Sequence, residues 1–193
     1  AAAGNMVYYG EGNSIVAADF TNANSPVVRG RLPLPGMVSD IEISGTLALV
    51  ANTQFGLQIV DVSNPAAMKL LGLYDTAGSA VRLAVRGKLA YVADSATLEI
   101  IDFTNPSIPL RKASIVTPDN PRDVAVTVVG TKTIACVAAD TAGVLVYDVT
   151  NPLAVTLLSS MGAGQDNWNV ALEGTRVLLL GPGAELKIYD IAQ

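Results

Sequence analysis

The sequence predicts an all-β fold built from repeated four-stranded units. Three observations predict it: a short motif recurs at nearly constant spacing, apolar residues alternate with period two before each copy, and no segment has the period of a helix of any length. Four-stranded units with a period of about 40–45 residues are typical of β-propeller blades. We therefore expect a β-propeller, or part of one, made of four-stranded antiparallel blades.

The recurring motif is Asp-x-Ser/Thr-Asn. Its copies begin at Asp19, Asp61, Asp102 and Asp148, with a degenerate copy at Asp190, so the spacings are 42, 41, 46 and 42 residues. These polar side chains can accept hydrogen bonds from nearby backbone N–H groups and tighten a turn. The motif is therefore expected to end a strand. Repeated acids also suit Ca²⁺, but that ion needs about six to eight oxygens and each copy lies in a different repeat.

Each repeat is expected to contain four strands, called a to d. Strand c precedes the motif, strand b lies about ten residues earlier, strand a comes before a glycine turn, and strand d follows the motif. In the clearest repeat these strands cover residues 40–43, 47–51, 57–60 and 68–74. Strand a would line the central channel of the propeller and strand d would lie outermost.

The repeats divide residues 1–193, taken as a single propeller domain or segment, into about 4.5 blades. The approximate blades are residues 1–36 (without strand a), 37–78, 79–119, 120–164 and 165–193 (without strand d). A ring that ended in this way would leave an apolar sheet face uncovered, which is an aggregation hazard. We therefore expect further blades or another copy to complete a larger ring, with an irregular five-bladed monomer as the alternative.

Two segments carry a resemblance to a known family. Residues 56–65 read Gly-Leu-Gln-Ile-Val-Asp-Val-Ser-Asn-Pro, and residues 89–94 read Leu-Ala-Tyr-Val-Ala-Asp. Both resemble the LVIVD family of propeller repeats, and the resemblance is strongest over residues 37–160. It implies a propeller in a bacterial or archaeal exported or cell-surface protein, so an extracellular or cell-surface location is expected. It implies no catalytic residues.

Composition narrows the function classes. Apolar residues make up 50% of the chain and charged residues 15%, which fits sheets covered on both faces and not disorder. The net charge of −5 argues against nucleic-acid binding, and no stretch approaches the roughly 20 apolar residues of a membrane span. The chain has no histidine, which removes histidine-based acid–base catalysis and histidine-ligated zinc. The single cysteine, Cys136, lies in an apolar run and is expected to be buried.

The candidate ligand-binding site is the rim of the channel, where the starts of the inner strands converge. Its candidate residues are Asp40, Arg82, Arg122, Asp123, Asp166, Trp168 and Asn169. Trp168 offers a flat apolar ring and a hydrogen-bond donor, which suits a sugar or a peptide. The alternative is that the polar residues satisfy backbone groups at the channel mouth and that Trp168 packs between blades. Asp94 and Asp140, at the ends of strand b, are expected to form turns.

The function expected from these features is a non-catalytic surface or secreted module that binds or scaffolds a protein or glycan partner. We expect no cofactor, no metal and no enzymatic activity. One alternative is a Ca²⁺-dependent hydrolase of lactonase type, with Asp40, Asp123 and Asn169 as ligands. Arg82 occupies the equivalent position of the repeat between Asp40 and Asp123. It places a cation where Ca²⁺ would bind, which argues against this hydrolase. A second alternative is a purely structural repeat of a surface layer or filament.

Overall fold

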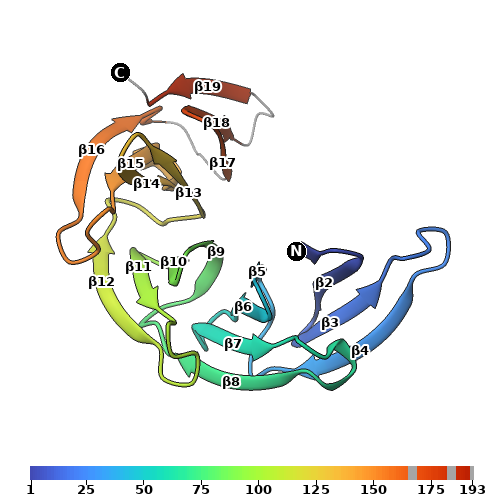
Figure 1. Ribbon diagram of the computed structural model, residues 1–193. Helices are drawn as coiled ribbons and strands as arrows, with labels where there is room; N and C mark the ends of the chain where they lie inside the picture. The colour runs from blue at the N-terminus through green and yellow to red at the C-terminus, as the bar shows by residue number, and fades with distance from the viewer. Residues whose placement is uncertain (165–168, 182–185, 192–193) are drawn as a thin grey trace.

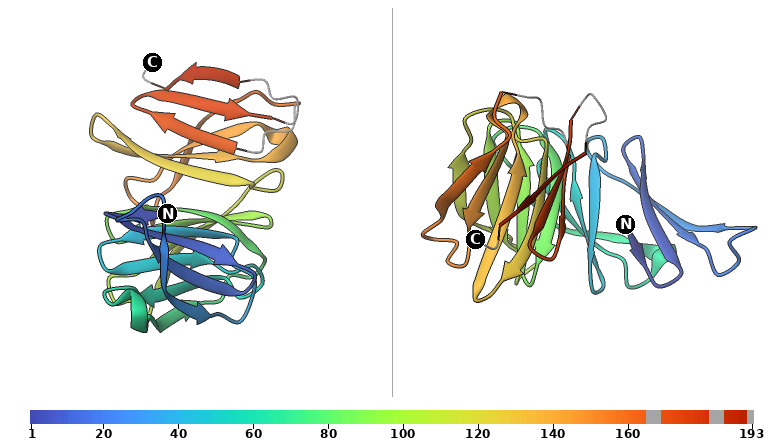
Figure 2. Two further views of the ribbon diagram at one scale, coloured as in Figure 1. Left: turned by 90° about the vertical axis from the view of Figure 1, so that its right-hand side faces the viewer. Right: turned by 90° about the horizontal axis from the view of Figure 1, so that it is seen from above.

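The structure is a computed structural model that describes residues 1–164, 169–181 and 186–191. It contains five antiparallel sheets that follow one another in chain order and form an open arc (Figure 1). Seen from above, successive sheets lie side by side (Figure 2). The packing that joins neighbouring sheets does not continue between the last sheet and the first, so the described residues form an arc and not a closed ring.

The strands are short and pair with their neighbours in sequence. The first sheet comprises β1 (Ala2–Ala3), β2 (Met6–Glu11), β3 (Ser14–Asp19) and β4 (Val27–Pro33). The second comprises β5 (Asp40–Ser44), β6 (Leu47–Ala51), β7 (Leu57–Asp61) and β8 (Lys69–Tyr74). The third comprises β9 (Ala80–Arg86), β10 (Leu89–Asp94), β11 (Thr97–Asp102) and β12 (Leu110–Val116). The fourth comprises β13 (Asp123–Val129), β14 (Lys132–Ala138), β15 (Val144–Asp148) and β16 (Thr156–Met161). The last comprises β17 (Asn169–Glu173), β18 (Arg176–Leu180) and β19 (Leu186–Asp190).

The prediction of an all-β fold of four-stranded antiparallel units is confirmed, with one correction at the N-terminus. The first sheet was expected to lack strand a, but β1 pairs with β2 through Ala2↔Val7 and Ala3↔Met6. The helical segments of the described residues are two short 3₁₀ turns, η1 (Pro65–Ala67) and η2 (Asp140–Ala142). No helix among these residues is long and apolar enough to cross a membrane.

The repeated motif forms the tight turn that the sequence predicts. In the second repeat the Asp61 carboxylate accepts the backbone N–H of Ser63 at 2.9 Å, and the Asn64 side chain accepts the N–H of Ala66 at 3.1 Å. The same pair of bonds recurs in the first, third and fourth repeats. Two consecutive side-chain-to-backbone bonds therefore end strand c and lead the chain out to strand d.

The hydrophobic cores lie between sheets. We call the side of a sheet that faces the next sheet in chain order its forward face, and the opposite side its back face. Because side chains alternate along a strand, Leu49 and Ile59 of the second sheet point forward, while Val50 and Val60 point back. Each pair of neighbouring sheets thus buries one forward face against one back face. The alternation along a strand therefore assigns successive apolar residues to the cores on the two sides of its sheet.

At the outer side of the arc, the Asn-Pro turn of one sheet lies against strand d of the sheet before it. A Cβ atom added to Gly30 in β4 would lie 2.1 Å from the carbonyl oxygen of Pro65, and one added to Gly72 in β8 would lie 2.3 Å from that of Pro106. Glycine is needed at both positions because backbone meets backbone there.

Candidate functional site

Four residues that occupy the same position in successive repeats, which we call a repeat column, lie on the inner strands of neighbouring sheets. Asp40, Arg82, Asp123 and Asn169 lie at or near the starts of β5, β9, β13 and β17, and these strands pack against one another in order around the inner side of the arc. The two aspartates bond across sheet junctions. Asp40 accepts the backbone N–H of Leu83 in the next sheet at 2.9 Å, and Asp123 accepts that of Val170 at 2.9 Å.

Each of these aspartates also accepts the N–H of the residue that follows it. The bonds from Ile41 to Asp40 and from Val124 to Asp123 are both 2.9 Å. Burial raises the pKa of Asp123, and its two backbone bonds act in the opposite direction. The Asp40 and Asp123 side chains therefore join neighbouring sheets, which is the structural alternative that the sequence left open for this column.

Arg82 takes a different role in the same column. Its Nη1 donates to the carbonyl oxygens of Ser39 and Val81, both at 3.1 Å, so one bond reaches back to the preceding sheet. Its Nε and Nη2 have no hydrogen-bond partner among the described residues. A guanidinium group presents five donors, and this one therefore has spare donors directed toward the inner rim.

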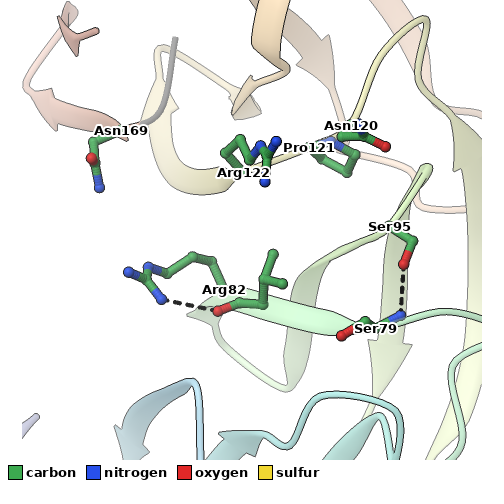
Figure 3. Close-up of a pocket in the computed structure, with 8 residues that line it drawn as sticks. Ser79, Arg82, Ser95, Asn120, Pro121, Arg122 and Asn169 are labelled. Atoms are coloured by element: carbon green, nitrogen blue, oxygen red, sulfur yellow. Dashed lines mark hydrogen bonds between the residues drawn. The ribbon is translucent and has the colours of Figure 1, made fainter. Parts of the chain in front are cut away.

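A pocket of about 480 Å³ opens at this rim, between the third and fourth sheets (Figure 3). Its lining consists of Ser79, Val81, Arg82, Ser95, Asn120, Pro121, Arg122 and Asn169. Arg82 extends from β9, and Arg122 extends from the segment before β13 on the other side of the hollow. The Nε of Arg122 bonds the carboxylate of Asp140 at 2.8 Å, which orients this guanidinium at the pocket wall.

A second hollow of about 470 Å³ lies along the inner strands themselves. Its charged lining residues are Asp40, Glu42, Arg82 and Asp123. Burial, together with the charge of Asp40, raises the pKa of Glu42. Among the described residues, no group of three or more aspartate, glutamate, histidine or cysteine side chains is placed to hold a metal ion. Arg82 stands between the acids, where its charge favours the ionised form of Asp123.

The candidate residues from the sequence fall into three groups. Arg82, Arg122 and Asn169 share the first pocket, and Asp40 and Asp123 line the second together with Arg82. Asp166 and Trp168 lie outside the described residues. Four residues of the pocket are not among the candidates predicted from the sequence: Ser79, Asn120 and Pro121, which precede the inner strands, and Ser95. A search of the segments between strand d and strand a for polar residues would have found Ser79 and Asn120.

The residues at the ends of strand b tie down those same segments. The side chain of Asn52 accepts the N–H of Gly36 at 2.8 Å, and that of Asp94 accepts the N–H of Gly78 at 3.0 Å. These bonds join residues 16 positions apart, so the side chain of Asp94 ties two segments together and does not form its own turn as the sequence predicts. The pocket wall at Ser79 is held in this way, with a further bond from its N–H to the Oγ of Ser95 at 2.8 Å.

The repeated sheets and their junctions define a repeat protein made of β-propeller blades. The sequence model of the LVIVD repeat matches residues 35–76 and 77–117, so the chain carries LVIVD repeats. These matches correspond to the second and third sheets and the segments between them. A comparison with curated proteins found no match.

Solved structures resemble the whole arc. The computationally designed Ika8 protein superposes with a TM-score of 0.80 at 12% identity, over 100% of this chain and 57% of that one. A chain of the mitotic checkpoint complex gives 0.79 at 11% identity, over 98% of this chain and 60% of that one. The designed Ika4 protein gives 0.64 at 11% identity, over 81% of this chain and 92% of that one. At these identities the likeness concerns the fold alone, and the chain spans less than two thirds of the length of Ika8.

Proposed function

We propose that this LVIVD-repeat arc is a non-catalytic binding or scaffold module that recognises carboxylate groups of a protein or glycan partner at the inner rim. The observation that carries the proposal is the pocket between the third and fourth sheets, where Arg82 and Arg122 lie among the hydroxyl and amide groups of Ser79, Ser95 and Asn120. Two guanidinium groups beside neutral hydrogen-bonding groups suit a ligand that combines a carboxylate with hydroxyls or amides. Acidic peptides and uronic-acid glycans have this chemistry.

The electrostatics support an acidic ligand group. Guanidinium groups bind carboxylates with paired, charge-assisted hydrogen bonds, and Arg82 has two nitrogens that donate to no described residue. The chain as a whole carries a charge of −5, so its general surface repels acidic molecules. The lining of this pocket contains two arginines and no carboxylate, so on an acidic protein it favours a carboxylate ligand at this place over the rest of the surface.

The residues of the inner column support a binding role over a hydrolytic one. Asp40 and Asp123 bond backbone N–H groups of the following sheets, so their carboxylates serve the sheet junctions. One structural neighbour is a chain of the mitotic checkpoint complex, which is a protein assembly. An exported or cell-surface setting, as the repeat family implies, is part of the same proposal.

The experiment measures binding of polyglutamate and polygalacturonate to the immobilised protein, with polylysine as the opposite charge. Arg82→Gln and Arg122→Gln are each expected to weaken polyanion binding roughly 10- to 100-fold, because a lost charge-assisted bond costs about 1.5–3 kcal/mol. Arg111→Gln removes the same charge from the exposed outer strand β12 and is the matched control. Equal binding by all three variants, or a preference for polylysine, would contradict the proposal.

A further inference from the structure

The junction between the second and third sheets buries two carboxyl groups. Asp94 of β10 and Glu99 of β11 are each 2% exposed. Val92, which pairs with Glu99 across the two strands, packs against the second sheet. Because side chains two residues apart on a strand share a face, Asp94 lies on this same back face, diagonally beside Glu99. Burial raises the pKa of Asp94 and the charge of Glu99 adds to the rise, as expected for close neighbours.

Each carboxylate has one oxygen that the protein holds and one oxygen without a partner. The Oδ2 of Asp94 accepts the N–H of Gly78 at 3.0 Å. The Oε1 of Glu99 accepts the hydroxyl of Ser114 and, at 3.0 Å, that of Thr97. The Oδ1 of Asp94 and the Oε2 of Glu99 are buried and accept no hydrogen bond from the described residues. No lysine or arginine in the described part of the chain forms an ion pair with either carboxylate, so both charges lack a counterion there.

A third buried oxygen without a partner lies at the same place. Thr76, in the segment between β8 and β9, is 3% exposed, and its hydroxyl has no hydrogen-bond partner. This hydroxyl opposes the burial-driven rise in the pKa of Asp94, so it lies near that carboxylate. The equivalent residue of the next segment, Thr117, donates to the carbonyl oxygens of Ala96 and Asp119 at 3.1 and 2.7 Å. The free hydroxyl is therefore a feature of this junction and not of the repeat.

The repeat itself does not require acids at these two positions. The equivalents of Asp94 and Glu99 are Asn52 and Gln58 in the second sheet and Ala139 and Leu145 in the fourth, all at most 2% exposed. The side chain of Asn52 accepts and donates hydrogen bonds, while Gln58 donates to a backbone carbonyl and keeps one uncharged oxygen without a partner. The third sheet thus has two acids where both of its neighbours have a neutral pair.

The charge and the donor atoms of this cluster indicate a divalent cation. Two ionised carboxylates at one buried place oppose folding unless a cation neutralises them. A proton or a monovalent ion would leave one negative charge, whereas Ca²⁺ neutralises both. Carboxylate and hydroxyl oxygens are ligands that Ca²⁺ prefers, and backbone carbonyls or water can complete its about six to eight oxygens. The set holds two acids, in keeping with the absence of a larger acid cluster among the described residues.

We propose that Asp94, Glu99 and Thr76 bind one Ca²⁺ ion inside the junction between the second and third sheets. The three oxygens that lack partners are its ligands, and the donors on the other carboxylate oxygens orient the two acids. Asp75, exposed at the start of the same segment, adds negative charge at the outer side of the site. The ion ties the segment of residues 75–79 to β10 and β11. This site is separate from the arginine pocket and does not depend on the ligand of that pocket.

The experiment titrates EDTA-treated protein with CaCl₂ in a calorimeter. One ion per chain is expected to bind with a Kd of about 1 mM or tighter, and Tm is expected to rise as Ca²⁺ is added. Asp94→Asn and Glu99→Gln are each expected to weaken binding at least about 100-fold and to lose the Ca²⁺-dependent rise in Tm. In EDTA both variants are expected to be at least as stable as the original protein, because each removes a buried charge that has no counterion. Loss of binding in these variants is thereby distinguished from loss of folding.

Matched variants separate this site from other acids of the chain. Thr76→Val is expected to weaken Ca²⁺ binding roughly 10-fold, whereas Thr117→Val is expected to leave the affinity unchanged. Asp102→Asn removes a turn acid of the same sheet and is expected to preserve binding. The proposal is overturned if no Ca²⁺ binds up to about 10 mM, a result that would assign neutralisation of the pair to a proton. It is also overturned if Asp102→Asn abolishes binding or if Glu99→Gln binds Ca²⁺ as tightly as the original protein.

Discussion

Replacement of Asp94 by asparagine is expected to stabilise the protein. Asp94 is 2% exposed at the end of β10; its Oδ2 accepts the N–H of Gly78 at 3.0 Å, while its Oδ1 has no hydrogen-bond partner. Burial raises the pKa of Asp94 and the nearby charge of Glu99 adds to the rise, while the bond from Gly78 and the nearby hydroxyl of Thr76 act in the opposite direction. One sheet earlier the equivalent residue is Asn52, whose side chain accepts the N–H of Gly36 and donates to its carbonyl oxygen at 2.7 Å.

The size of the effect follows from these contacts. An asparagine at position 94 keeps the bond from Gly78 and replaces an unpartnered carboxylate oxygen by an N–H₂ group that can donate to a backbone carbonyl. A buried unpartnered polar atom costs about 1–3 kcal/mol and a new hydrogen bond contributes about 1 kcal/mol. Asp94→Asn is therefore expected to raise the free energy of unfolding by about 2 kcal/mol at pH 7. For a chain of 193 residues this corresponds to a rise of roughly 4–8 °C in Tm.

The effect must depend on pH. A carboxyl whose pKa is higher in the folded than in the unfolded state binds a proton on folding, so its ionisation lowers stability as pH rises from about 4 through the folded pKa. The advantage of the asparagine is therefore expected to be large at pH 7 and to shrink as pH falls toward 4. Urea denaturation of both proteins between pH 4 and pH 7.5 measures this difference.

Asp140→Asn is the control, because Asp140 lies two residues after β14 of the next sheet, at the start of η2, and forms an ion pair with Arg122. It is expected to give no stabilisation. If Asp94→Asn destabilised the protein, or if its effect were the same at pH 4 and pH 7, the reasoning from the Asn52 contacts and the buried charge would be refuted.

Three further predictions concern other parts of the fold. Gly72→Ala is expected to lower the free energy of unfolding by about 1–3 kcal/mol in urea denaturation, because the new Cβ would meet the Pro106 carbonyl oxygen at 2.3 Å. Hydrogen bonds from Thr150 hold the pKa of Asp148 at about 2, so its contribution to stability is complete above pH 4 and is lost as pH falls toward 2. NMR titration should show this pKa rise in Thr150→Ala. Burial raises the pKa of Cys136 to about 12, so its thiol should react with iodoacetamide only after unfolding.

Each of these predictions has a contrary result. A Gly72→Ala protein as stable as the original would mean that the backbone contact at the outer side can relax. An Asp148 pKa near 4 in the original protein would contradict the turn hydrogen bonds. Alkylation of Cys136 at pH 8 without denaturant would contradict its burial between the fourth and fifth sheets.

Local patterns were sufficient to predict most strands. The strands expected at residues 40–43, 47–51 and 57–60 correspond to β5, β6 and β7, because alternation and turn chemistry act over a few residues. The glycine turns were predicted for the same reason, and Gly45 and Gly87 have φ values of 62° and 60°. β1 was missed because a two-residue strand of alanines has no period and exists only through its pairing with β2.

The repeat, its strands, its turns and the columns of equivalent residues are all specified by local sequence patterns. The role of each column, in contrast, depends on how neighbouring sheets pack. Asp40 and Asp123 bond the next sheet, while Arg82 in the same column bonds the preceding one and leaves donors at a pocket. Leu57 and Leu186 have the same place in the repeat, yet one is 0% and the other 56% exposed. The physical reason is that burial and pairing depend on the neighbouring sheet, which lies across a junction and cannot be inferred from one repeat alone.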